Sequence, residues 1–130
     1  MDRDTLIYKA IQASKMSYSP FSHYKVGAAL LIEDGTVFFG TNVENDSYGL
    51  TMCAERSAIF SAISNGARPK DFVAMAVVTV DGGTSCGACR QVLAQFNMNM
   101  PIHFCAVKDD LLTQVISMTP ADMLPQPFKL

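Results

Sequence analysis

The first third of the chain changes from a helical to an extended pattern of apolar positions. Near the N-terminus, small and apolar side chains recur every three or four residues, which predicts an amphipathic helix capped by Asp4. These positions are Leu6, Ile7, Ala10, Ile11 and Ser14. Two extended runs follow, residues 25–32 and 37–42, and Glu33-Asp34-Gly35 between them predicts a β-hairpin. In the first run, Gly27-Ala28-Ala29 is small enough for another element to pack closely on it.

Beyond a polar loop over residues 44–51, helical and extended segments alternate. Asn65-Gly66 is a typical end of a helix, and Asp81-Gly82-Gly83 interrupts an apolar strand. The predicted elements are a helix over 53–64, a strand over 72–80, a helix from 85 or 86 to 96, strands over 101–107 and 111–116, and a short helix that begins at Thr119-Pro120.

This order, α-β-β-α-β-α-β-β-α, predicts a single α/β domain over residues 1–130. The central β-α-β-α-β stretch indicates parallel neighbouring strands joined by right-handed crossovers. Residues 108–110 are too few for a crossover helix, so we expect the last strand to return antiparallel. The predicted architecture is one mixed five-stranded sheet between helices, a three-layer α/β/α arrangement.

Composition indicates in which compartment the protein works and which kinds of partner it binds. Apolar residues make up 49% of the chain and charged residues 17%, which fits either apolar surface covered by another subunit or a well-filled monomer core. The net charge is −2 and no segment concentrates Lys or Arg, so we expect a small neutral substrate and no nucleic acid. The chain shows no apolar run of membrane-spanning length and no signal-peptide pattern. We therefore expect a cytoplasmic protein, in which four cysteines indicate metal binding or catalysis before disulfides.

Three of the cysteines are placed at predicted helix starts. Cys86 and Cys89 are three residues apart at the start of one helix, and Cys53 opens another. Free backbone N–H groups and the positive end of the helix dipole stabilise thiolates at such positions. Three thiolates on a zinc ion would leave the fourth tetrahedral position open, which is typical of catalytic zinc sites.

Glu55, two residues after Cys53, favours catalysis over two alternatives. A redox disulfide, or half of a structural zinc site, would also place a CxxC motif at a helix start. His23 and His103, the candidates for a fourth ligand, lie in or beside predicted strands, and we interpret both as structural or surface residues. A carboxylate that borders the metal without binding it can shuttle protons. A helix-favouring glutamate explains Glu55 alone, but not its combination with three cysteines.

Two segments resemble the zinc-binding motifs of the cytidine deaminase family. They are Thr51-Met52-Cys53-Ala54-Glu55-Arg56 and Ser85-Cys86-Gly87-Ala88-Cys89-Arg90-Gln91. Residues 19–30 are similar to the family's S-P-[YF]-S-x-[FY]-x-V-G-A-A-L segment, residues 42–48 to its N-[VI]-E-N-x-x-[YF] loop, and residues 124–128 to its C-terminal L-P-x-x-F. The C-x-E motif, with cysteine in place of histidine, resembles the small homotetrameric branch.

Ser85 departs from the family pattern, which usually has proline before the second cysteine motif. A serine can cap the helix instead. We therefore expect a small effect on the rigidity of the loop and no loss of zinc.

The resemblance implies that Cys53, Cys86 and Cys89 bind one zinc ion per subunit and that Glu55 is the general acid and base. Zinc would supply hydroxide for attack at C4 of the pyrimidine, while Glu55 takes the water proton and passes it to N3. Glu55 would then help to move a second proton to the departing amino group. Arg56 is placed to donate to the thiolates and to offset their charge. A surface salt bridge is the alternative role of Arg56.

Four residues are implied to bind the substrate. Asn42 and Glu44 point to one side of an extended segment and suit a ribose hydroxyl, and the alternative is a polar loop that stabilises itself. Tyr24 resembles the aromatic residue that lies over the base, and Phe128 resembles the residue that reaches into a neighbouring subunit's site. Taken alone, these aromatics also fit a core position and a terminal anchor.

Together these features predict zinc-dependent deamination of the nucleosides cytidine and deoxycytidine, in pyrimidine salvage, by a homotetramer. A deaminase of another aminonucleoside, such as blasticidin, would share the chemistry, but Asn42 and Glu44 favour a ribose or deoxyribose. A structural zinc or redox module is the non-enzymatic alternative. The missing basic surface disfavours a polynucleotide deaminase.

Overall fold

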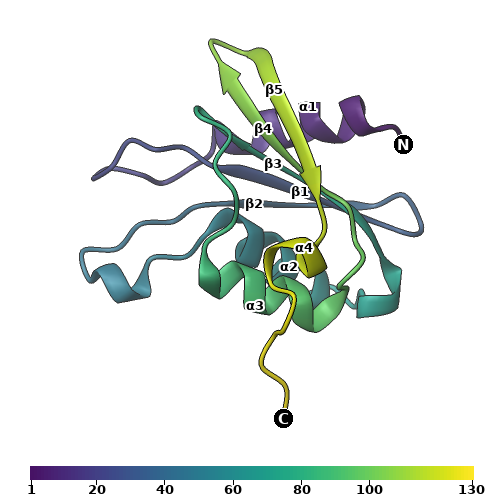
Figure 1. Ribbon diagram of the computed structural model, residues 1–130. Coiled ribbons are helices and arrows are strands. Elements are labelled where there is room, and N and C mark those ends of the chain that lie inside the picture. Colours follow the sequence, from purple (N-terminus) through teal and green to yellow (C-terminus); the bar gives the residue numbers. More distant parts are fainter.

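A computed structural model describes all 130 residues (Figure 1). The helices are α1 (Arg3–Ser14), α2 (Ala54–Ser64), α3 (Gly87–Phe96) and α4 (Pro120–Met123), with 3₁₀ turns η1 (Tyr48–Leu50) and η2 (Pro69–Asp71). The strands are β1 (Gly27–Ile32), β2 (Val37–Thr41), β3 (Phe72–Thr79), β4 (Ile102–Lys108) and β5 (Leu111–Met118). The order of helices and strands expected from the sequence is confirmed. None of the helices has the length and hydrophobicity that crossing a bilayer requires.

The five strands form one mixed sheet in the order β2-β1-β3-β4-β5. β3 and β4 are parallel, and all other neighbouring pairs are antiparallel, including β5 as predicted. The expectation of parallel neighbours throughout the central stretch is wrong for β2 and β3, because β1 lies between them and pairs with both. All six residues of β1 are buried, whereas β2 is largely half-exposed. The more apolar strand of the hairpin therefore takes an interior position, and β2 becomes an edge.

Helices cover both faces of the sheet, which confirms the three-layer prediction (Figure 1). Successive residues of a strand point to opposite faces, so the uninterrupted apolar strands serve two cores. Ala29 and Leu31 of β1 belong to a core of 8 buried residues shared with α1. Ala28 and Leu30 belong to a core of 16 buried residues shared with α2 and α3. The two helices whose starts carry cysteines thus lie on the same face.

Two glycines allow helices to approach the sheet at backbone distance. A Cβ atom on Gly27 would lie 2.2 Å from the carbonyl oxygen of Ala10 in α1, which explains the run of small residues there. A Cβ atom on Gly40 would lie 2.1 Å from the carbonyl oxygen of Ala54, in the first turn of α2. Gly40 therefore sets the distance between β2 and the helix start that carries Cys53.

The cap of α1 differs from the expectation. Asp2 is the N-cap, and its Oδ1 accepts a hydrogen bond from the backbone N–H of Thr5 at 2.8 Å. Asp4, the expected cap, lies in the first turn, where a carboxylate also stabilises the positive end of the helix. Asp2 and Asp4 are both acidic and lie two residues apart, so the sequence pattern did not show which of them caps the helix.

Candidate active site

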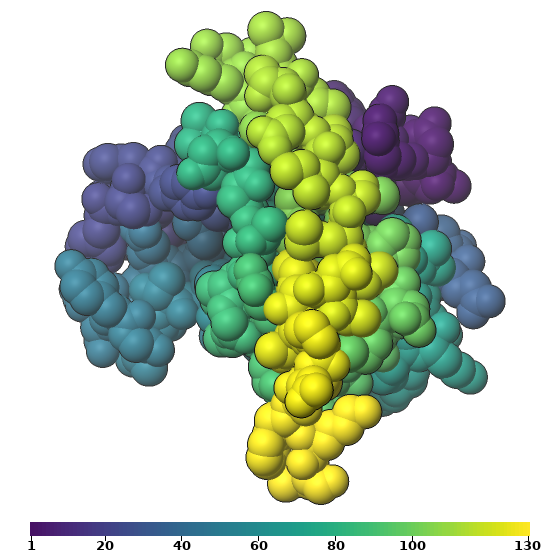
Figure 2. Space-filling model, viewed as in Figure 1, coloured from purple at the N-terminus to yellow at the C-terminus, as the bar shows by residue number.

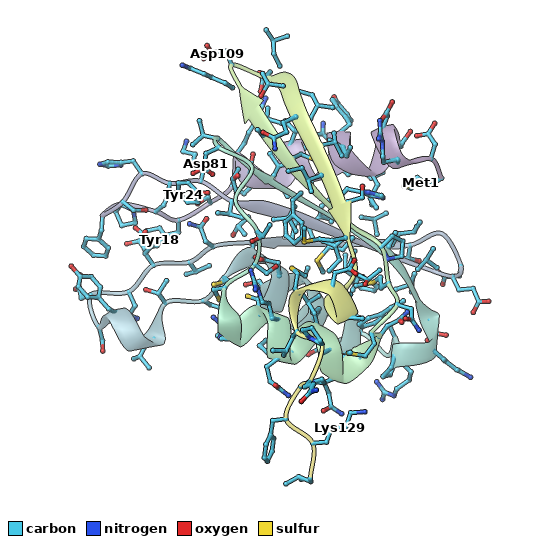
Figure 3. The ribbon with its side chains drawn as sticks, in the orientation of Figure 1. Met1, Tyr18, Tyr24, Asp81, Asp109 and Lys129 are labelled. Atoms are coloured by element: carbon cyan, nitrogen blue, oxygen red, sulfur yellow. The ribbon has the colours of Figure 1, made fainter.

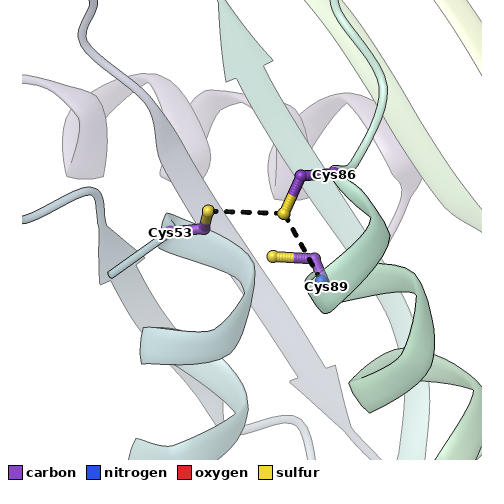
Figure 4. Close-up of side chains that lie close together, drawn as sticks. All are labelled: Cys53, Cys86 and Cys89. Atoms are coloured by element: carbon purple, nitrogen blue, oxygen red, sulfur yellow. Dashed lines mark hydrogen bonds between the residues drawn. The ribbon is translucent and has the colours of Figure 1, made fainter. Parts of the chain in front are cut away.

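The N-terminal ends of α2 and α3 bring three cysteines together (Figure 4). Cys53 is the N-cap of α2, Cys86 is the N-cap of α3, and Cys89 lies in the first turn of α3. Their Sγ atoms all lie within 4.8 Å of one another, and those of Cys53 and Cys86 are 3.7 Å apart. The two histidines lie elsewhere: His23 is exposed before β1, and His103 contacts Ser117 across the β4–β5 pair. The prediction that both cysteine segments begin helices is confirmed.

The three sulfur atoms fit a zinc ion in spacing and in charge. Two thiolates on a tetrahedral zinc ion, with bonds of about 2.3 Å, lie about 3.8 Å apart, close to the 3.7 Å between Cys53 and Cys86. Hydrogen bonds from Cys89, and then from Arg56 and Cys86, lower the pKa of Cys53 to about 5. The Cys53 sulfur and burial together raise the pKa of Cys89. A divalent cation is what allows such close thiols to ionise together.

Arg56 brings positive charge to this group. Its Nη2 donates to Cys53 Sγ at 3.4 Å, and its Nε is buried without a hydrogen-bond partner. The hydrogen bond to Cys53 also raises the pKa of the guanidinium. Arg56 takes part in neither of the two ion pairs of the structure, Arg3–Asp4 and Lys15–Asp110, so the surface salt bridge is wrong. Donation to a thiolate is the arrangement observed.

Glu55 is 5% exposed in the first turn of α2, beside the cysteines. Burial raises the pKa of its carboxyl group, and a hydrogen bond from Ser85 opposes that rise. The Ser85 hydroxyl donates to Glu55 Oε2 at 2.7 Å. The expectation that Ser85 caps α3 is wrong, because Cys86 is the cap and its Sγ accepts from the backbone N–H of Cys89. Sequence reasoning missed this contact, and the one signal for it was the departure from proline.

A cavity of about 220 Å³ opens beside Glu55. Cys53, Cys86, Asn42 and Tyr24 also line it, so most of the site residues expected from the sequence share one space. Tyr24 reaches across from the segment before β1, and its hydroxyl donates to Asp81 Oδ1 at 2.6 Å (Figure 3). Burial, and then the contact with Asp81, raises the pKa of Tyr24. The Tyr24–Asp81 pair therefore links two loops at the cavity and was not expected from the sequence.

Hydrogen bonds of Asn42 and Glu44 join the polar loop after β2 to the segment before β1. Asn42 donates to the carbonyl oxygen of Tyr24 at 2.6 Å and accepts from the backbone N–H of Val26 at 3.0 Å. Glu44 accepts from the backbone N–H groups of Phe21 and Ser22 and from the Ser22 hydroxyl, which lowers the pKa of its carboxyl group. The contacts of Asn42 and Glu44 thus run to the segment before β1 and not within their own loop, which differs from the alternative of a loop that stabilises itself. Asn42 lines the cavity, and Glu44 does not.

Phe128 lies on a C-terminal tail away from the cavity. The tail extends beyond the body of the molecule (Figure 2), and the Phe128 side chain is 71% exposed. Gln91 of α3 holds the backbone of Phe128 through two hydrogen bonds of 3.0 and 3.1 Å. The structure therefore does not bring Phe128 to the cavity of its own subunit.

Comparison with known proteins agrees with this geometry. The model of the cytidine and deoxycytidylate deaminase zinc-binding region matches residues 1–104. A cytidine deaminase of Sporosarcina psychrophila is 45% identical over 131 residues, which cover 98% of this chain and 92% of that protein. The chain belongs to the cytidine deaminase family.

Solved structures of this family share the fold. A cytidine deaminase from Burkholderia pseudomallei superposes with a TM-score of 0.91 at 44% identity, covering 98% of this chain and 100% of that one. One from Mycobacterium tuberculosis has a TM-score of 0.80 at 36% identity, covering 100% of this chain and 99% of that one. The cysteines, the glutamate and the arginine of this site therefore lie on the same fold as in these solved structures.

Proposed function

We propose that this protein catalyses the zinc-dependent hydrolysis of cytidine and deoxycytidine to uridine or deoxyuridine and ammonia. The observation that carries the proposal is the group of three thiols with a buried glutamate, Glu55, at one small cavity. Curated relatives named cytidine deaminase, which the chain matches over nearly its whole length, support the same reaction.

In this proposal Cys53, Cys86 and Cys89 hold one zinc ion per subunit. When bound, zinc supplies a Lewis acid that lowers the pKa of a water molecule toward neutrality. The chain provides the three sulfurs at two helix starts, where backbone N–H groups favour their ionised form. With three protein ligands, the site keeps one position for a small molecule, as catalytic zinc sites do.

Glu55 moves the protons of the reaction. It takes a proton from water as the oxygen adds to C4 of the pyrimidine, and it delivers that proton to N3. It then passes the proton of the new C4 hydroxyl group to the exocyclic nitrogen, so that the C4 carbonyl forms, the C4–N bond breaks and ammonia leaves. A buried carboxyl group with a raised pKa is suited to both halves of this cycle, because it takes up a proton and releases it at similar cost.

Three residues are proposed to recognise the nucleoside. Tyr24 and Asn42 line the cavity, so the Tyr24 ring is available to the base, and we propose that the second N–H of the Asn42 amide, beside the one bonded to Tyr24, serves the ribose. Glu44 is held by the segment before β1 that carries Phe21 and Ser22, and we propose that it turns to a ribose hydroxyl when the substrate binds. A ribose or deoxyribose partner distinguishes this reading from deamination of blasticidin.

The central test is direct. The purified protein should convert cytidine and deoxycytidine to the uracil nucleosides, followed by the absorbance change of the base and by ammonia release, with about one zinc ion per chain. Tetrahydrouridine, whose C4 hydroxyl mimics the tetrahedral carbon, should bind far more tightly than uridine. Zinc without turnover of any cytosine nucleoside would favour a structural zinc module, and turnover of blasticidin alone would favour the other aminonucleoside.

We further propose that the protein is a cytoplasmic homotetramer in pyrimidine salvage and that Phe128 completes the site of a neighbouring subunit. Large apolar side chains are exposed on both edge strands, among them Phe39 of β2 and Leu111 of β5. Such surface is usually covered by a partner. The tail that carries Phe128 extends away from the body, where it can reach another copy.

Deleting residues 128–130 should raise KM for cytidine, because the neighbouring site loses an apolar wall. Deleting only Lys129 and Leu130 is the matched control, since Phe128 and its backbone contacts with Gln91 remain. Steady-state kinetics with light scattering after size exclusion measure both effects. A full-length monomer whose activity is unchanged by the longer deletion would refute the shared site.

Arg56→Gln should lower kcat by about 10- to 100-fold, the usual range for residues that orient metal ligands. Three thiolates and one Zn²⁺ carry a net charge of −1, which makes the ion a weaker electrophile, and Arg56 offsets this charge through Cys53. Adding Cys53→His removes one negative charge and should recover part of the kcat. The measurements are kcat and zinc content for the single and the double variant. Arg3→Gln, at an exposed arginine, is the control.

A fully active Arg56→Gln enzyme with normal zinc would show that Arg56 has no role in charge balance. An impaired single variant that the histidine does not improve would assign Arg56 to positioning alone.

A further inference from the structure

Ser85 and Glu55 form a buried hydrogen bond inside the proposed site. Ser85 is 3% exposed and Glu55 is 5% exposed, and Ser85 Oγ lies 2.7 Å from Glu55 Oε2. Glu55 accepts no other side-chain hydrogen bond, and it lines the cavity. One carboxylate oxygen, Oε2, is therefore held by a side chain, and no side chain donates to the other, Oε1.

The backbone at Ser85 is itself held in place. Arg90 of α3 donates from Nε to the carbonyl oxygen of Ser85 at 2.8 Å. The same guanidinium donates to the hydroxyl of Thr84 at 3.1 Å and to the carbonyl oxygen of Met123, before the C-terminal tail, at 3.2 Å. Three contacts from one planar group thus hold the segment that carries Ser85 against α3 and α4.

The two residues link the two segments that carry the three cysteines. Ser85 immediately precedes Cys86, and Glu55 follows Cys53 by two residues. A carboxylate in the first turn of a helix can rotate about its side-chain bonds, and Ser85 is the one side chain that donates a hydrogen bond to Glu55. A buried hydroxyl with a strong acceptor at 2.7 Å selects one of these orientations.

We propose that Ser85 is a positioning residue for the deamination reaction. Its hydroxyl holds Glu55 Oε2, so that Oε1 faces the cavity and carries every proton transfer between water, N3 and the departing amino group. Because the hydroxyl occupies Oε2 as a donor, Oε1 is the oxygen left free to face the substrate. This inference rests on the proposed function, because it concerns the proton path of the same reaction.

The test compares Ser85→Ala with Ser85→Thr, which keeps a hydroxyl, and with Ser61→Ala, which removes a hydroxyl from α2 outside the site. Ser85→Ala should lower kcat for cytidine by about tenfold, the effect of losing one hydrogen bond to a charged group. Its KM, zinc content and melting temperature should stay near those of the unchanged protein. Ser85→Thr should recover most of the kcat, and Ser61→Ala should not change it.

Ligand binding separates positioning from a structural effect. Ser85→Ala should weaken binding of tetrahydrouridine, which mimics the reacting carbon, by about tenfold and leave binding of uridine within twofold. A Ser85→Ala enzyme with kcat within twofold of the unchanged protein would overturn the proposal. So would equal losses of uridine and tetrahydrouridine affinity, loss of zinc, or a Ser85→Thr enzyme that holds zinc and is as slow as Ser85→Ala. An unchanged protein that does not deaminate cytidine would instead overturn the proposed function.

Discussion

Glu55→Gln is expected to abolish nearly all deamination while the protein keeps its fold and its zinc. Glutamine has almost the same shape as glutamate and can still accept from Ser85, but it cannot take up and release a proton at neutral pH. A general acid–base group contributes about 10²–10⁴-fold to a rate, and Glu55 is proposed to serve several transfers, so we expect a loss at the upper end. The measurements are kcat/KM for cytidine, zinc content and circular dichroism.

A matched variant distinguishes the chemistry of Glu55 from a loss of charge. Glu33→Gln makes the same change at an exposed position in the turn between β1 and β2, and it should leave kcat/KM unchanged. Activity of Glu55→Gln within a few-fold of the unchanged protein would remove Glu55 from the proton path. Another group at the cavity would then have to carry the protons.

Removing one thiol should remove the metal and the activity together. Cys86 is the most exposed of the three cysteines, so Cys86→Ala disturbs the core least. Two remaining thiolates cannot hold zinc with the open geometry of a catalytic site, and we expect zinc to fall from about one ion per chain to a small fraction. Metal analysis after dialysis, with the rate of cytidine turnover, gives both numbers.

Cys105→Ala is the control, because Cys105 is the one cysteine outside the group and lies buried in the core shared with α1. It should keep zinc and activity and lose only about 1 kcal/mol of the free energy of unfolding. Chelation of zinc from the unchanged protein should also stop turnover, and added zinc should restore it. A Cys86→Ala protein that is active with a full complement of zinc would show that Cys86 is not a ligand.

Local features of the chain were enough to predict the elements that position the site. Apolar periodicity and turn residues identified all five strands and the four helices, because these signals act over a few neighbouring residues. Cys53 and Cys86 were expected at helix starts, and both are N-caps, since the end of a helix is set by its own first residues. The cap of α1 was misplaced from Asp2 to Asp4, where two acidic residues carry the same local signal.

The neighbours of each strand could not be predicted in the same way. The pattern indicated that β2 and β3 are adjacent, but β1 lies between them. Local periodicity shows that β1 is apolar and says nothing about which strands flank it. Its place inside the sheet follows from burial of both faces, which depends on the packing of α1 on one side and α2 on the other.

The sequence by itself determined the chemistry available to this protein: three cysteines and a glutamate at helix starts, on a chain with the motifs of the cytidine deaminase family. Only the tertiary structure decided which groups meet. Cys53 and Cys86 are far apart along the chain, yet their sulfurs lie 3.7 Å apart because α2 and α3 pack on one face of the sheet. The same packing turns Ser85 from an expected helix cap into the partner of Glu55, since a buried hydroxyl bonds to the strongest acceptor within reach.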